Sequence, residues 1–201
     1  MSSTQNWRHI CIDMQRMFSE DTPWKVDWMP QILPNVEEIA GRYPERTIFT
    51  RFVPPEHARD APGRWSKYYA KWWMMTGEHL AKEMLCLPEQ LARLVPPAKI
   101  LDKRIYSPWL EGHLHQALSD DGVGILVLTG GETDVCVLAT VLGAVDLGYA
   151  VVLVEDAVCS GADQTHDAAL RLLHDRFSAQ LSVRTTEDFV HARGDVRSLA
   201  G

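Results

Sequence analysis

Cys136 is the residue whose position in this chain points most clearly to chemistry. It lies a few residues after the apolar run 124–128 and directly before a stretch with a helical pattern at 138–147. A thiol between the carboxyl end of a parallel strand and the start of a helix faces the crevice above the sheet and the positive end of the helix dipole. We therefore expect Cys136 to be a nucleophile with a lowered pKa. The alternative is inert packing, which is the commoner role of a free cysteine.

Two charged residues are expected beside this thiol. Asp13 ends the apolar run 9–13, and Lys103 ends the run 99–103. The carboxyl ends of parallel strands share one edge of a sheet, so a carboxylate, an ammonium and a thiol would converge there. Taken singly, Asp13 could cap a loop and Lys103 could be a solvated strand end. Together with Cys136 they predict a catalytic site.

The elements that must position these residues alternate between apolar β-branched runs and helical patterns, which is typical of βαβ units. The strands are expected at 9–13, 46–51, 99–103, 125–129, 150–154 and 179–183, and the helices at 32–42, 111–120, 138–147 and 163–177. We predict an α/β fold of three layers, α-β-α, with a central, mostly parallel six-stranded sheet of Rossmann-like type. The 201 residues are expected to form a single domain, 1–201.

The stretch 53–95 is too long for an ordinary connection between strands. We interpret it as a tryptophan-rich insertion, part helical and part functional loop. It contains Trp65 and the quartet Trp72-Trp73-Met74-Met75, which could line a pocket, form a buried helix or cover a subunit interface.

Composition limits the possible partners and compartments. The net charge is −7 and no basic block is present, so nucleic acid is not an expected partner. No apolar run approaches the roughly 18 residues of a membrane span, and the first residues lack a signal-peptide core, so we expect a cytoplasmic protein with no membrane partner. The cysteines, Cys11, Cys86, Cys136 and Cys159, lack CxxC spacing and are expected to be free thiols.

Four segments in order resemble the isochorismatase-like cysteine hydrolases, a family that includes nicotinamidases, N-carbamoylsarcosine amidases and ureide hydrolases. They are 12–15 with Phe18 behind it, 103–109, 130–137, and 154–157 followed by His166. Each segment alone is weak evidence for the family, but all four in this order and at suitable separations are specific to it.

The resemblance implies an Asp-Lys-Cys triad. Asp13 would be the general base, Lys103 would offset its charge, and Cys136 would attack a carbonyl carbon to form a thioester. The resemblance also implies a cis peptide at Gly131–Glu132, with the backbone amides of Glu132 and Cys136 as the oxyanion hole. The implied function is hydrolysis of the C–N bond of a small carboxamide, imide or ureide by a homo-oligomer, either a dimer or a tetramer.

The chain departs from the family's pattern at the metal site. The Asp-x-His pair of nicotinamidases is absent from the segment 50–57, where only Glu56 and His57 remain as ligands. We therefore expect no metal and no cofactor, and nicotinamidase activity is disfavoured.

The substrate pocket is expected to be aromatic. Phe18, Trp24 and Trp109 are its candidate walls, which suits a small flat substrate. Arg51 either binds a substrate carboxylate or pairs with a nearby acid.

Two other function classes remain open. The first is a true isochorismatase, which cleaves a vinyl ether by protonation and needs no thiol. The second is a non-catalytic relative that binds a partner through the tryptophan-rich insertion. An exposed thiol of low pKa could also serve as a redox sensor.

Overall fold

The six strands form one parallel sheet in the order β3-β2-β1-β4-β5-β6. The computed structural model describes residues 6–193 and 195–200. The strands are β1 (Asn6–Ile12), β2 (Thr47–Phe52), β3 (Lys99–Lys103), β4 (Val123–Gly131), β5 (Ala150–Cys159) and β6 (Leu181–Arg184). The predicted α/β class and its mostly parallel sheet are confirmed.

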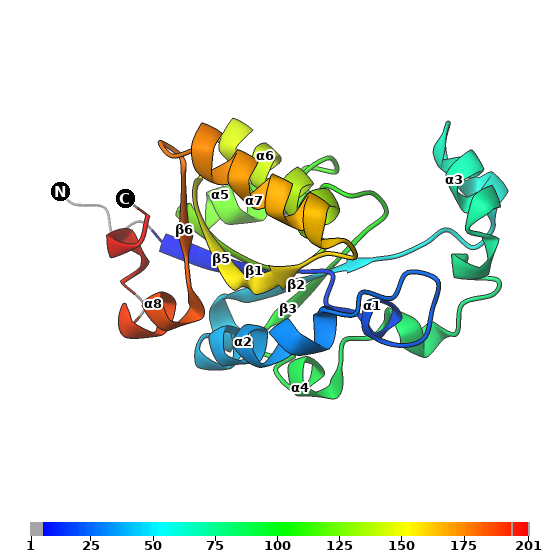
Figure 1. Ribbon diagram of the computed structural model, residues 1–201, viewed down its shortest axis with the longest axis horizontal. Coiled ribbons are helices and arrows are strands. Elements are labelled where there is room, and N and C mark those ends of the chain that lie inside the picture. The colour runs from blue at the N-terminus through cyan, green and yellow to red at the C-terminus, as the bar shows by residue number, and fades with distance from the viewer. Residues whose placement is uncertain (1–5, 194, 201) are drawn as a thin grey trace.

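Helices cover both faces of this sheet (Figure 1). One face carries α1 (Arg16–Ser19), α2 (Met29–Arg42), α4 (Glu89–Ala92) and α8 (Thr186–His191), and the other carries α5 (His113–Asp120), α6 (Leu138–Asp146) and α7 (Asp163–Arg176). Alternate strand residues point to opposite faces, so the core is divided into two apolar clusters, one under α2 and one under α6. Among the described residues, no helix has the length and apolar character needed to cross a bilayer.

Strand β5 runs well past its predicted end. The exposed Glu155 and Asp156 interrupt its apolar pattern, which is why the sequence suggested a stop at residue 154. Pairing with β4 nevertheless resumes after an irregularity, with Gly130 opposite Val158 and Gly131 opposite Cys159. The longer strand brings Cys159 and Ser160 beside the end of β4.

The segment between β2 and β3 consists of short helices joined by loops. These are η2 (Ala58–Asp60), α3 (Trp65–Lys71), η3 (Trp73–Met75), η4 (Lys82–Leu85) and α4. Figure 1 shows the part with α3 extending beyond the carboxyl ends of the strands. Within the quartet 72–75, Met75 is fully buried and Trp73 is 52% exposed. The quartet is therefore partly core and partly surface.

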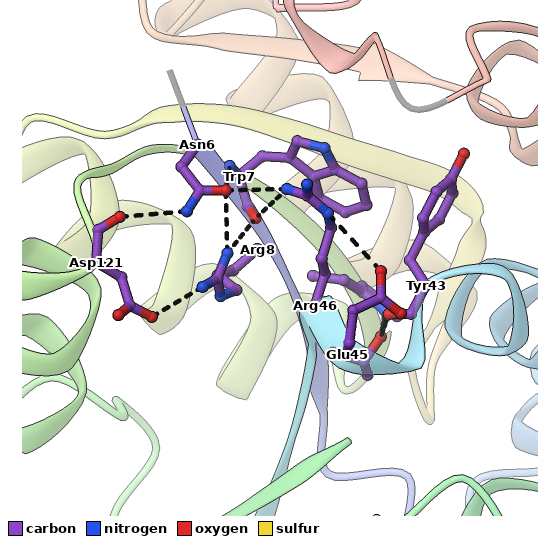
Figure 2. A network of polar contacts seen from close by, with 9 residues as sticks. Asn6, Trp7, Arg8, Tyr43, Glu45, Arg46 and Asp121 are labelled. Carbon is purple, nitrogen blue, oxygen red and sulfur yellow. Dashed lines mark hydrogen bonds and ion pairs between the residues drawn. The ribbon is translucent and has the colours of Figure 1, made fainter. Parts of the chain in front are cut away.

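The start of β1 is fixed by a polar network (Figure 2). Asn6 Oδ1 accepts hydrogen bonds from Arg8 at 3.1 Å and from Arg46 at 2.9 Å, and Arg8 also pairs with Asp121 at 2.8 Å. The Arg46 guanidinium lies 5.0 Å from the centre of the Trp7 ring. These contacts tie β1 to the segments that precede β2 and β4, its two neighbours.

His9 links the same three strands inside the core. Its ring nitrogens lie 3.1 Å from Thr47 Oγ1 on β2 and 2.8 Å from Thr129 Oγ1 on β4. Complete burial lowers the pKa of His9 to about 3, so the folded protein holds a neutral imidazole.

This lowered pKa predicts a loss of stability on acidification. The unfolded chain binds a proton at His9 below about pH 6.5, whereas the folded chain does not until about pH 3. Between about pH 7.5 and about pH 5.5, His9 should therefore remove about 1.4 kcal/mol from the free energy of unfolding. Urea titrations of wild type and His9→Gln should show this extra loss in wild type alone. Equal losses in both proteins would contradict the assignment.

Candidate active site

Asp13, Lys103 and Cys136 meet at the carboxyl edge of the sheet. Asp13 directly follows β1, Lys103 is the last residue of β3, and Cys136 lies in a π-helical turn, Thr133–Val137, between β4 and α6. From β1 the chain adds β2 and then β3 on one side of the sheet. It then crosses to β4 on the other side of β1 and adds β5 and β6 there, so the strand order reverses between β1 and β4. A reversal of this kind opens a crevice above the strand ends.

Asp13 is held in one orientation by the neighbouring strand. Its backbone has a positive φ of 51°, which turns the chain out of β1. Its Oδ1 accepts a hydrogen bond of 2.6 Å from the Thr50 hydroxyl, and its Oδ2 lies 2.6 Å from Lys103 Nζ. Apart from that ion pair, the buried Oδ2 has no hydrogen-bond donor among the described residues. One carboxylate oxygen is therefore left with a lone pair for a further proton.

Lys103 connects the carboxylate to the thiol. Its Nζ donates to the Ile105 carbonyl at 3.1 Å and to Cys136 Sγ at 3.6 Å, and it lies 5.0 Å from the centre of the Phe52 ring. Burial alone would lower the pKa of Lys103, but the negative charge of Asp13 and the contacts with Asp13 and Cys136 outweigh burial and raise the pKa. The group therefore remains an ammonium ion.

The expected low pKa of Cys136 is wrong. Burial raises the pKa of this thiol well above its ordinary value, the charge of Asp13 raises it further, and only Lys103 opposes them. The start of a helix alone would favour the thiolate, but the side chain is 5% exposed and lies beside the Asp13 carboxylate. The resting site holds a protonated thiol next to an aspartate–lysine ion pair.

The backbone before Cys136 passes very close to β1. The Gly131–Glu132 peptide is cis. Gly130 has a φ of 110°, and a Cβ atom there would lie 2.1 Å from the Ile12 carbonyl oxygen. Only glycine fits between the two central strands at this point.

An aromatic cavity of about 330 Å³ opens above the thiol. Its lining residues are Phe18, Pro23, Trp24, Lys25, Phe52, Tyr68, Trp72, Tyr106, Glu132 and Cys136. The structure thus brings two predicted walls, Phe18 and Trp24, to the nucleophile, and the two rings stack at 6.2 Å. A larger hollow of about 500 Å³ between α2 and α7 contains none of the three reactive residues.

Arg51 and Trp109 lie away from this cavity. Arg51 forms a two-point ion pair with Asp102, at 2.7 and 2.8 Å, which favours the structural alternative for this residue. Trp109 packs on the opposite face of the sheet, where its indole donates to the Thr140 carbonyl at 2.9 Å and stacks on Tyr149. A Cβ atom at Gly143 of α6 would lie 2.3 Å from this indole, so α6 makes room for the ring.

The sequence did not single out several residues that build the site. Thr50, which orients Asp13, sits at a buried position of a predicted strand, and that burial was the available signal. Tyr68 of α3 carried no signal, because its approach to the cavity depends on how the insertion packs. The family resemblance gives a role to the backbone amide of Glu132 and none to its side chain, which lines the cavity.

Glu56 and His57 are the two possible metal ligands in the segment 50–57. His57 Nδ1 lies 3.1 Å from Glu78 Oε2. Among the described residues, no group of three or more His, Cys, Asp or Glu side chains is arranged to hold a metal ion.

Comparison with known proteins identifies the family of this fold and site. The isochorismatase domain model matches residues 9–185. The chain belongs to the isochorismatase family. A probable inactive nicotinamidase of Arabidopsis thaliana is 27% identical over 180 residues, which cover 82% of this chain and 87% of that protein.

Solved structures of other proteins share the architecture of this chain. A cysteine hydrolase from Pseudomonas syringae pv. phaseolicola has a TM-score of 0.80 at 22% identity, covering 92% of this chain and 91% of that one. A pyrazinamidase of Pyrococcus horikoshii in complex with zinc has a TM-score of 0.67 at 26% identity, covering 89% and 98%.

The raised pKa of Cys136 gives a test by alkylation. In a Cys86→Ser background the one exposed cysteine among the described residues is removed, and burial raises the pKa of Cys11 and of Cys159 to about 12. Iodoacetamide should then label Cys136 slowly at neutral pH and faster as the pH rises.

Adding Asp13→Asn should speed this labelling at neutral pH several-fold. The substitution removes the negative charge that raises the pKa of the thiol and leaves Lys103 free to pair with the thiolate. Peptide mass spectrometry identifies the labelled cysteine. Equal or slower labelling in the Asp13→Asn protein would contradict the assignment of the raised pKa to the charge of Asp13.

Proposed function

We propose that this protein is a metal-independent cysteine hydrolase that cleaves the C–N bond of a small carboxamide, imide or ureide through a thioester. The observation that carries the proposal is the continuous contact from Asp13 through Lys103 to Cys136, at 2.6 and 3.6 Å, at the base of an aromatic cavity.

The first step is attack by the thiol. Cys136 passes its proton to Asp13 Oδ2 as the sulfur bonds to the substrate carbonyl carbon. Lys103 holds the carboxylate in place and stabilises the forming thiolate. The raised pKa of the resting thiol fits a nucleophile that ionises only as substrate enters.

The following steps use the same carboxyl group. The backbone amides of Glu132 and Cys136 would donate to the oxyanion. The protonated Asp13 gives its proton to the departing nitrogen, which leaves as ammonia or an amine. Water then loses a proton to Asp13 and attacks the thioester, releasing a carboxylic or carbamic acid, and the proton returns to Cys136.

The comparisons support this proposal at different levels. The hydrolase and amidase names of the Pseudomonas and Pyrococcus proteins agree with C–N bond hydrolysis. The Arabidopsis relative described as probably inactive shows that family membership alone does not secure activity. The proposal therefore depends on the three residues and the cavity of this chain.

The function is tested by ammonia release from a panel of aromatic amides, cyclic imides and ureides. Wild type should turn over members of the panel with or without EDTA. Cys136→Ala and Asp13→Asn should each lower kcat/KM by more than about 10³-fold, because each removes a group that forms or breaks a bond. Cys86→Ser, at an exposed cysteine, is the matched control and should keep full activity.

Two results would overturn the proposal. Turnover that persists in Cys136→Ala would exclude the thioester. Pyruvate release from isochorismate by the same variant, with no amide turned over by wild type, would establish vinyl ether hydrolysis instead.

We also propose that the protein is a homo-oligomer in which the insertion contributes to the interface. The half-exposed Trp73 beside α3 is an apolar side chain that a second copy would cover. Light scattering should give a dimer or tetramer, and Trp73→Ser should shift the mass toward the monomer. A monomeric wild type would refute this arrangement.

A further inference from the structure

The side chain of Glu132 places a carboxyl group in the wall of the cavity. The residue is half-buried and lines the cavity together with Cys136. No Lys, Arg or His nitrogen of the described residues lies within 4.0 Å of its carboxylate oxygens. A Cβ atom built on Gly161 would lie 3.6 Å from Glu132 Oε1, which places the carboxyl on the β5 side of the cavity.

The charges around Glu132 leave this region negative. Asp134 accepts a hydrogen bond from the Ser160 hydroxyl but has no ion-pair partner among the described residues. Asp13 is neutralised by Lys103, and Lys25 at the cavity is exposed and paired with Asp27 at 3.0 Å. Burial first, and then the charges of Asp134 and Asp13, raise the pKa of Glu132 to about 7. A positive charge brought into the cavity would relieve this repulsion.

The rest of the cavity wall suits the same kind of group. Six aromatic side chains line it: Phe18, Trp24, Phe52, Tyr68, Trp72 and Tyr106. Trp24 is central to this wall, with ring centres of Phe52, Tyr68 and Trp72 within 6.4 Å of its own. Aromatic faces attract alkylammonium and other organic cations, and they do so more strongly in a site removed from water. Aromatic faces do not attract a substrate carboxylate in this way.

We propose that Glu132 is a specificity-determining residue, and that the cavity selects a small carboxamide or ureide that carries a positively charged nitrogen. The Glu132 carboxylate pairs with this cation while the aromatic walls enclose its alkyl groups. Substrates with a free carboxylate are repelled by Glu132 and Asp134. The inference rests on the proposed function for the identity of the scissile group, but the binding preference itself does not require turnover.

The test compares two amides of the same shape. Betaine amide carries a trimethylammonium group, and 3,3-dimethylbutanamide carries a neutral tert-butyl group in its place. Dissociation constants are measured by calorimetry in a Cys136→Ala background, which prevents turnover. With Glu132 present, the cation should bind at least about ten-fold tighter than its neutral isostere at about pH 8.

Glu132→Gln in this background should reduce the preference for the cation several-fold, because the amide keeps the size of the side chain and loses its charge. The aromatic walls keep their own smaller attraction for the cation. Glu187→Gln, at an exposed glutamate of α8, is the matched control and should keep the wild-type ratio. Lowering the pH below about 7 should weaken binding of the cation alone, because Glu132 then becomes protonated. The other charged or titratable side chains that line the cavity are Lys25, Tyr68, Tyr106 and Cys136. Asp134, Asp13 and Lys103 lie nearby without lining it.

An unchanged ratio in Glu132→Gln would overturn the inference. Equal binding of the two amides with Glu132 present, or no binding of the cation at millimolar concentration, would also overturn it. Selective binding of the cation without turnover of any amide by wild type would refute the hydrolase and leave the selectivity standing. Turnover of amides without this selectivity would refute the cation preference and leave the hydrolase standing.

Discussion

The contact between Lys103 and Asp13 is the interaction on which the rest of the site depends. The two charged atoms are 2.6 Å apart, and the side chains are 4% and 1% exposed. Taking both ions out of water costs several kcal/mol each, so a pair of this kind is weak support for stability. Removing one partner would leave a buried, uncompensated charge, at a cost of about 3–5 kcal/mol. The fold holds the pair in place by bringing the ends of β1 and β3 to one edge and by adding the Thr50 hydroxyl.

The pair also explains how a buried thiol could act as a nucleophile. Burial raises the pKa of Cys136, so an isolated thiolate at this position would be unfavourable. Moving the thiol proton to Asp13 leaves the net charge of the three groups unchanged, since one anion replaces another beside the same ammonium. The low-dielectric surroundings that oppose a lone thiolate then penalise this transfer far less. The same surroundings strengthen the attraction of Lys103 for the thiolate.

Much of this arrangement could be predicted from the sequence because it follows from the periodicity of a parallel sheet. Asp13 and Lys103 close two apolar runs and Cys136 follows a third, and strand ends meet at one edge whatever the loops do. The ion-pair partner of Arg51 could not be predicted in this way. It lies directly opposite Asp102 in the register of β2 and β3, and register appears only when the strands pair.

The position of the Trp109 side chain and the pKa of Cys136 could not be predicted from the sequence either. Trp109 follows Lys103 closely, but the loop turns its indole to the far face, where Gly143 leaves space for it. The ionisation of Cys136 depends on how deeply the insertion and α1 bury it, which is a property of tertiary packing. Tyr68 reaches the cavity by that same packing.

We propose that Asp13, Lys103 and Cys136 act as one catalytic unit, and a double-mutant cycle can test this proposal. With the best amide substrate, kcat/KM is measured for wild type, Asp13→Asn, Cys136→Ala and the double variant, with folding checked by circular dichroism. If they do, the double variant is no slower than Cys136→Ala alone, because loss of Cys136 already abolishes the step in which Asp13 takes part. Losses that multiply in the double variant would show that the two residues contribute independently, and would contradict it.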